Sequence, residues 1–232
     1  MLFLLACTGS GDDSATEFVF DRDMVAEECS AISGIVGVGS EWTYGPNAEF
    51  SAGGSDLDET IRVTNVDERD VEAQSLRTLT EAAADTGDTA SEPEGTIEHY
   101  TWQFRCEVDG LYLLSEHREH YASLSMGGGA DLSGTRRYDP AVLVLPFSLD
   151  DTPSWTESYA GTSDYPGEDA AIAYTRACTA LAASPVDFAV GTLSAHEIAC
   201  TSSDAAHDET YWQVSALGRA RDATRELLAY TP

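Results

Sequence analysis

The sequence predicts a mainly β protein, built as a single antiparallel curved sheet or open barrel with few short helices. Apolar residues recur at every second position over short runs, which is the period of a strand rather than of a helix. Turn residues separate these runs at short intervals, and strands do not alternate with long helical segments, so an antiparallel meander is favoured over a parallel-sheet enzyme fold. Hydrophobic residues make up 42% of the 232 positions, enough for a packed core.

The strands are expected in order along the chain, each bounded by Gly, Pro, Asp or Asn. Trp42 and Tyr44 share one face of the first strand, and the later runs repeat this pattern. The expected strands lie at 41–44, 61–66, 71–80, 102–108, 111–114, 142–147, 155–159, 170–178, 186–190, 193–201 and 210–214.

The clearest hairpin is centred on Asp109-Gly110, a strong two-residue turn signal. Before it, alternate residues from Trp102 to Val108 are expected to point inward, and Leu111 begins the return strand. Both strands are apolar enough to occupy the centre of the sheet.

Two segments allow alternatives. Leu76 and Leu79 are also spaced for a helix, so a helix over 68–84 competes with the strand. Residues 219–230 fit either a helix or a strand pair. The stretch 84–95 is an acidic loop.

The N-terminal run Leu4-Leu5-Ala6-Cys7 resembles the lipobox of bacterial lipoproteins. The resemblance implies that Cys7 receives a diacylglycerol and becomes the mature N-terminus. Only six residues precede Cys7 and none is basic, whereas an export signal has a basic region before its apolar core, so we expect the true start to lie upstream. Thr8 follows the cysteine in place of the Asp that favours inner-membrane retention, which indicates the outer membrane.

The expected organisation is a lipoprotein signal at 1–7, a flexible acidic tether at 8–23, and one extracytoplasmic β-rich domain at 24–232. Membrane attachment is expected only through the lipid on Cys7, because no later segment approaches the length of an apolar membrane span.

The four remaining cysteines form an even set in a chain expected to be exported, which predicts two disulfides. Cys178 and Cys200 lie in neighbouring strand-like runs with turn signals between them, so we pair these two. Cys29 then pairs with Cys106 by exclusion. Paired Cys-x-x-Cys spacings are absent from the sequence, so a zinc site is not expected.

The formal net charge of -29 arises from 41 acidic residues and 12 basic ones, all of them Arg. This charge repels nucleic acid and anionic lipid headgroups, so no nucleic-acid partner is expected. Cation binding or life in high salt would explain it, and so would a surface that only keeps the protein in solution.

Several landmarks resemble a loose class of uncharacterised secreted bacterial β-rich domains. The resemblance implies a sheet curled around an apolar interior, somewhat like lipoprotein-carrier folds, and it implies no catalytic residue. The landmarks are Trp42-x-Tyr44, Cys106-x-x-Asp109-Gly110-Leu111-Tyr112, Leu145-Pro146 followed by Trp155, Gly191-Thr192-Leu193-x-Ala195, and Tyr211-Trp212 followed by Gly218.

The sequence gives only weak indications of a catalytic or metal site. His117 and His120 are expected on opposite faces of one strand, which argues against chelation unless His99 or His196 joins one of them. The acidic runs at 56–59 and 85–94 offer oxygen ligands for weak calcium binding but lack the spacing of an EF-hand loop. Neither a nucleophile elbow nor a nucleotide-binding glycine motif is present. We therefore expect no catalytic residues, metal or cofactor.

The aromatic residues either form the core or line a ligand pocket, and a large cavity between them would decide for the pocket. The sequence thus predicts a non-enzymatic envelope lipoprotein that binds an apolar ligand or an envelope protein. An extracellular hydrolase or metal-dependent enzyme is the alternative, and it requires histidines and carboxylates to meet in one cleft. The aromatic residues concerned are Trp42, Tyr44, Trp102, Tyr112, Trp155, Tyr211 and Trp212.

Overall fold

The computed structural model describes residues 29–30, 33–35, 37–52, 55–80, 95–122, 132–150 and 153–232. Their fold is mainly β, as predicted, with thirteen strands in one antiparallel sheet. The elements in chain order are β1 (Glu41–Pro46), α2 (Ala48–Ala52), β2 (Asp56–Asp67), β3 (Asp70–Thr80), β4 (Gly95–Cys106), β5 (Gly110–Ala122), β6 (Leu132–Pro146), β7 (Ser154–Ser163), β8 (Ala171–Ala180), β9 (Ser184–Phe188), β10 (Gly191–Ser202), η2 (Ala205–His207), β11 (Glu209–Val214), β12 (Gly218–Arg221) and β13 (Arg225–Thr231).

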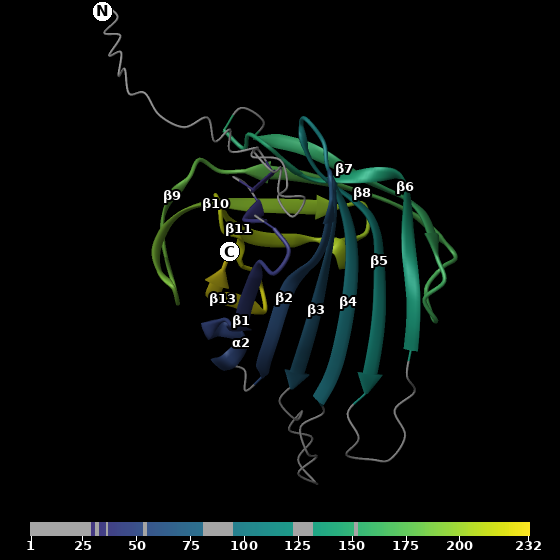
Figure 1. Cartoon of the computed structure of the whole chain (residues 1–232), viewed down its shortest axis with the longest axis horizontal. Coiled ribbons are helices and arrows are strands. Elements are labelled where there is room, and N and C mark those ends of the chain that lie inside the picture. The colour runs from purple at the N-terminus through teal and green to yellow at the C-terminus, as the bar shows by residue number, and fades with distance from the viewer. Residues whose placement is uncertain are drawn as a thin grey trace, which may run out of the picture.

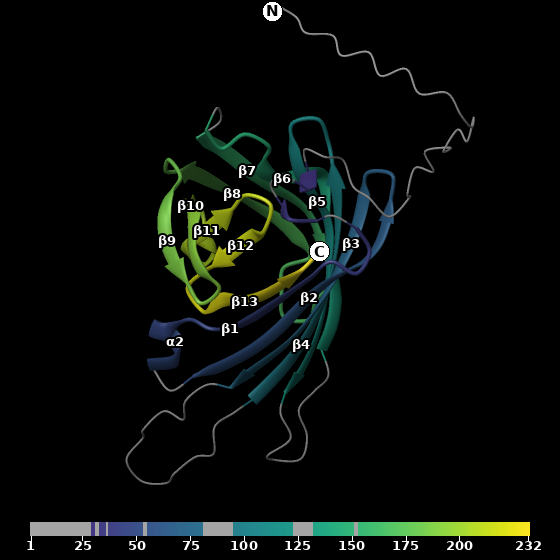
Figure 2. The ribbon, with the colours of Figure 1, turned by 60° about the vertical axis from the view of Figure 1, so that its left-hand side comes forward.

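The sheet closes into a twelve-stranded barrel (Figures 1 and 2). From β1 to β8 each strand pairs with the next, β8 pairs with β10, and β10 pairs with β11. The ring is completed because β13 pairs with β1, with Trp42 opposite Tyr230. Closure leaves the barrel strands without the exposed edges of an open sheet. Only β9 lies outside the ring.

Side chains alternate between the barrel interior and the outer surface. In β3, Val71, Ala73 and Ser75 are buried, whereas Leu76 is 57% exposed. Leu76 and Leu79 therefore lie on opposite faces of a strand, and the alternative helix over 68–84 is wrong where the structure describes it. The strand forms because β2 and β4 pair with both of its edges.

β4 and β5 form the predicted hairpin, but its turn is longer than two residues. The last paired residue of β4 is Cys106, opposite Leu111, and Val108 is 90% exposed rather than inward-facing. Gly110 is required because a Cβ there would lie 2.6 Å from the carbonyl oxygen of Leu145. The prediction for Val108 was wrong because the turn takes three residues.

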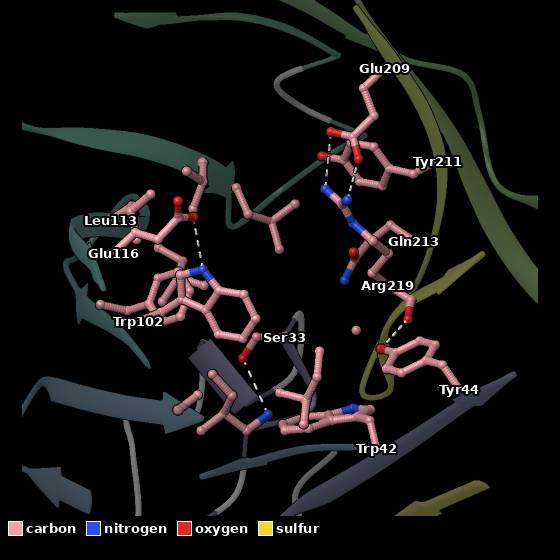
Figure 3. A pocket seen from close by; sticks show the side chains of 18 of the residues that line it. Ser33, Trp42, Tyr44, Trp102, Leu113, Glu116, Glu209, Tyr211, Gln213 and Arg219 are labelled. Atoms are coloured by element: carbon pink, nitrogen blue, oxygen red, sulfur yellow. Dashed lines mark hydrogen bonds and ion pairs between the residues drawn. The ribbon is translucent and has the colours of Figure 1, made fainter. Parts of the chain in front are cut away.

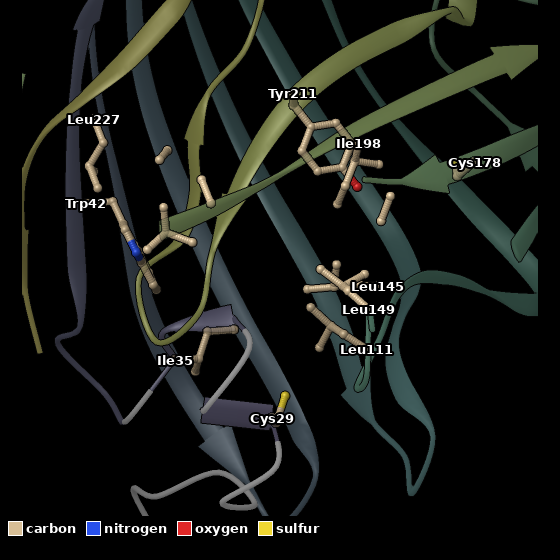
Figure 4. Close-up of a cluster of buried hydrophobic side chains, with 14 of the residues drawn as sticks. Cys29, Ile35, Trp42, Leu111, Leu145, Leu149, Cys178, Ile198, Tyr211 and Leu227 are labelled. Carbon is tan, nitrogen blue, oxygen red and sulfur yellow. The ribbon is translucent and has the colours of Figure 1, made fainter. Parts of the chain in front are cut away.

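The expected cysteine pairs both reach disulfide distance. Cys178 on β8 lies directly opposite Cys200 on β10, with their Cα atoms 4.0 Å apart. The Cα atoms of Cys29 and Cys106 are 6.1 Å apart, so this pair ties the segment before β1 to the end of β4. Figure 4 shows Cys29 and Ile35 on this segment in the buried cluster that includes Leu111 and Leu145.

β9 and the first part of β10, residues 191–195, pair with each other and form a second layer outside the barrel. Phe188 at the end of β9 is buried, and the guanidinium of Arg221 from β12 lies 4.8 Å from its ring centroid. Trp212 of β11 joins the same contact, with its ring 5.7 Å from that guanidinium. The hairpin thus covers the outer face of β11 and β12.

The C-terminal segment forms the strand pair β12 and β13, which settles the alternative between helix and strands over 219–230. The signal at 1–7 with Cys7, the tether at 8–23 and the acidic run at 85–94 lie outside the described residues. None of the described helices has the length and apolar character needed to cross a membrane.

Candidate functional site

The barrel encloses a cavity of about 380 Å³ between its walls (Figure 3). This volume lies in the range of small-molecule sites. The cavity has an apolar wall and a charged wall, and aromatic rings stand on both. The aromatic residues that line it are Trp42, Tyr44, Trp102, Phe104 and Tyr211.

The apolar wall is formed by inward-facing residues of β3 to β6. Trp102 and Phe104 of β4 alternate with outward-facing residues, as the strand period requires. Across the hairpin, Phe104 lies opposite Leu113. Ala73 on the neighbouring β3 is the smallest side chain of this wall and leaves room in front of it. The remaining apolar lining residues are Ile35, Ile61, Leu111, Val144 and Leu145.

The polar tips of the two cavity tryptophans are already bonded to the protein. Trp102 Nε1 donates to Glu116 Oε2 at 3.0 Å, and its ring stacks on Tyr100 with a centroid separation of 5.3 Å. Trp42 Nε1 donates to the carbonyl oxygen of Leu217 at 2.6 Å. These bonds fix both rings in place, so the cavity is bounded by rigid aromatic surfaces.

The charged wall belongs to a row of seven side chains of alternating sign, which we call the charge chain; four of the seven border the cavity, namely Arg176, Glu209, Arg219 and Arg225. It runs from β2 through β13, the turn before it, β12, β11 and β8 to β7. Each neighbouring pair along it forms an ion pair. In order, its members are Glu59, Arg225, Asp222, Arg219, Glu209, Arg176 and Glu157.

Most contacts of the charge chain are short, and the longest is that of Arg219 Nη1 with Asp222 Oδ2 at 3.9 Å. Arg225 Nε lies 2.8 Å from Asp222 Oδ2, and Arg225 also pairs with Glu59. Arg176 Nη2 lies 3.0 Å from Glu209 Oε2. Aromatic faces cover two of the cations, since the Arg219 guanidinium lies 3.9 Å from the Tyr211 ring centroid and Arg225 lies 4.6 Å from that of Tyr44.

Burial makes this pairing obligatory, because an isolated buried charge costs several kcal/mol. Burial alone would raise the pKa of Asp222, but Arg225 and Arg219 outweigh it and lower this pKa to about 2. Glu209 behaves in the same way: burial opposes its ionisation, yet Arg219 and Arg176 hold its pKa below the usual value. Glu157 lies at the β7 end of the charge chain. There burial outweighs the effect of Arg176 and raises the pKa of the Glu157 carboxyl.

A second group of interior charges centres on Glu98 of β4. Arg118 donates a hydrogen bond to Glu98, His120 Nδ1 lies 3.3 Å from Glu98 Oε1, and Arg77 Nη1 lies 3.7 Å from Glu98 Oε2. Burial would raise the pKa of Glu98, but these neighbours, Arg118 first, lower it. These side chains do not line the cavity.

The histidines occupy several different environments. His120 faces the interior, whereas His117 faces outward and lies 2.9 Å from Thr135 Oγ1, so the two point to opposite faces as predicted. On the outer surface His99 lies 3.1 Å from Glu119, which also approaches His117. His196 is bonded to the carbonyl oxygen of Leu181.

The histidines therefore do not converge on one cleft, and the described part of the chain gives no support to the hydrolase or metal-dependent alternative. The acidic run at 56–59 is split by strand alternation: Asp56 and Asp58 are exposed, while Glu59 is buried and accepts from Ser75. Its oxygens do not gather as calcium ligands would.

One group of potential metal ligands does lie close together among the described residues. Ligand atoms of Glu157, Cys178 and Cys200 lie within 4.8 Å of one another. Because the two sulfurs are at disulfide distance, they are not thiolate ligands. This group is a disulfide beside a buried carboxylate.

Some of the aromatic residues serve in both places, because Trp42, Tyr44 and Tyr211 belong to the buried core cluster and also border the cavity. Trp42, Tyr44, Trp102 and Tyr211 line it. The other candidates lie elsewhere: Trp155 is buried and donates to Glu157, Trp212 packs under the β9–β10 hairpin, and Tyr112 bonds Asp109 near the surface.

The sequence prediction did not include the charge chain. The sequence contained an indication of it. Arg176 and Cys178 are two positions apart and so point to the same face of their strand, and the same holds for Glu209 and Tyr211. Charged residues at inward positions of a predicted strand mark an interior polar site.

No family model matches the sequence, and no match was found among curated proteins or solved structures.

Proposed function

We propose that this protein is a non-enzymatic binding protein whose barrel takes up one small amphiphilic molecule. The observation that carries the proposal is the cavity of about 380 Å³, with an apolar aromatic wall facing a charged wall. A barrel that served only as a structural unit would fill this space with side chains. The apolar wall would hold the body of the ligand, and the charged wall would orient its polar group.

We further propose that the protein works outside the cytoplasm, held at the outer membrane by lipid on Cys7. The lipobox-like Leu4-Leu5-Ala6-Cys7 supports this proposal, as do two cysteine pairs at disulfide distance, because disulfides persist in oxidising compartments. Mass spectrometry of the N-terminal peptide from a membrane fraction tests it. A diacylated Cys7 is expected, and an unmodified Cys7 followed by the intact chain would refute it.

Binding is tested with N-phenylnaphthylamine, an uncharged probe that fluoresces in apolar sites. We expect saturable binding to the wild-type protein and energy transfer from the cavity residues Trp42 and Trp102. Ala73→Phe fills the space beside Trp102 and should weaken binding at least tenfold, about 1.4 kcal/mol.

Gln74→Phe is the matched control, because it places the same side chain one position away on the outer face of β3. It should bind the probe as the wild type does. Absence of saturable binding by the wild type, or equal loss in both variants, would contradict a ligand site inside the barrel.

A further inference from the structure

The charge chain has no cation left to receive an anionic ligand. Each of its three guanidiniums lies between two carboxylates. Arg225 contacts Glu59 and Asp222. Arg219 and Arg176 share Glu209, and their second carboxylates are Asp222 and Glu157, respectively. With four carboxylates around three cations, the charge chain has no surplus positive charge.

The opposite wall is balanced in the same way. Glu116, which borders the cavity, accepts from Trp102 and pairs with Arg136 at 3.1 Å. Arg136 in turn pairs with Glu168, so it too lies between two carboxylates. A ligand carboxylate entering the cavity would compete with a carboxylate already present, inside a protein of formal net charge -29.

A ligand cation meets a related obstacle. The two carboxylates at the cavity surface, Glu116 and Glu209, are each engaged by at least one arginine. Burying an ammonium group would remove its water without supplying a free counter-ion, and this desolvation is costly.

Arg176 offers a ligand no free donor at its Nε atom. This atom is buried and lies 3.3 Å from Glu157 Oε2, so it faces the protein rather than the cavity. An uncharged polar group neither competes with the wall carboxylates nor needs a counter-ion, so its entry costs less desolvation than that of an ion.

We propose that the ligand is an uncharged amphiphile, with an apolar chain or ring system against Trp102 and Leu113 and a polar group, such as a hydroxyl, ester or amide, that carries no charge. This inference rests on the proposed function and specifies its ligand class. Free fatty acids and alkylammonium ions are discriminated against because the wall charges are already neutralised by one another.

The test compares 1-decanol, decanoate and decylammonium, which share a chain and differ in head-group charge, as competitors of N-phenylnaphthylamine at neutral pH and physiological salt. We expect 1-decanol to displace the probe with an apparent Kd at least about tenfold lower than either ion. Equal or tighter binding of an ion, or probe binding that none of the three displaces, would overturn the inference and leave the binding function standing. Failure of the probe itself to bind would refute the binding function.

A variant tests the charge-balance argument directly. Glu209→Gln keeps the size of the side chain but removes the carboxylate shared by Arg219 and Arg176. We expect its affinity for decanoate to rise about tenfold relative to the wild type. Asp58→Asn on the outer face of β2 makes the same change in net charge and should leave decanoate binding unchanged. Thermal denaturation is the control for folding. If Glu209→Gln unfolds in a cooperative transition, and so is folded, but gains no affinity for decanoate, the charge-balance argument is wrong.

Discussion

At the scale of single residues, Asp222 shows how the interior tolerates charge. One of its oxygens pairs with Arg225, while the other accepts from the backbone N–H groups of Thr224 and Arg225. The same carboxylate therefore closes the turn before β13 and links two arginines of the charge chain. A carboxylate with this many donors is stabilised in its ionised form.

The depressed pKa of Asp222, about 2 against an ordinary value of 3.8, has a consequence for stability. Because the folded pKa lies below the unfolded one, the stabilisation is complete above about pH 4 and is lost as the pH falls toward 2. Asp222→Asn should therefore lower the free energy of unfolding by about 2 kcal/mol at pH 7. Urea denaturation at pH 7 and pH 3 measures the free energy of unfolding of both proteins.

The difference in the free energy of unfolding between Asp222→Asn and the wild type should be smaller at pH 3 than at pH 7. Asp58→Asn, at an exposed position of β2, is the control and should differ little from the wild type at either pH. A deficit of equal size at both pH values would show that hydrogen-bond geometry, not charge, is what the substitution removes.

At the scale of elements, strand alternation was the predictable part of this molecule. The pairs Trp42 with Tyr44 and Trp102 with Phe104 identified inward faces correctly, because a period of two survives in any antiparallel sheet. Val108 was misplaced because turn length depends on the close approach of Gly110 to β6, a tertiary contact. Whether aromatic residues fill a core or line a cavity depends on barrel diameter, which no local pattern encodes.

The β9–β10 hairpin should contribute stability without contributing to binding. Phe188 is 7% exposed, and Phe188→Ala should lower the free energy of unfolding by about 3 kcal/mol through lost burial and an unfilled space. Probe affinity should be unchanged, because Phe188 does not line the cavity. Urea denaturation and probe titration measure the two quantities.

Val190→Ala, at the exposed tip of the same hairpin, serves as the comparison and should change stability by less than about 0.5 kcal/mol. A Phe188→Ala protein as stable as the wild type would mean that the hairpin is not packed on the barrel.

At the scale of the whole molecule, the pair Cys29–Cys106 connects the fold to the site. The segment that begins at Cys29 carries Ser33 and Ile35 to the cavity, and the cysteine pair holds it against β4. Peptide mapping without reduction tests both cysteine pairs.

Replacing Cys29 and Cys106 together by Ser should cost about 4 kcal/mol by loop entropy and also weaken probe binding. The matched double substitution at Cys178 and Cys200 closes a shorter loop, so it should cost about 3 kcal/mol. Since Cys178 and Cys200 join two strands that already pair with each other and hold no separate segment against the cavity, probe affinity should be retained. Equal loss of binding in both double variants would show that the segment after Cys29 has no special part in the site.

The pairing of β13 with β1 has a consequence for how the chain reaches this state. Tyr230 donates a hydrogen bond to the carbonyl oxygen of Gly34, 196 residues earlier, so the last seam of the barrel joins distant parts of the sequence. Such contacts form late and slowly, because chain entropy must be lost before they are made. Until then the sheet has two edge strands with unpaired backbone N–H and C=O groups, to which a strand of a neighbouring chain could pair. Electrostatic repulsion between chains of formal net charge -29 opposes such an association.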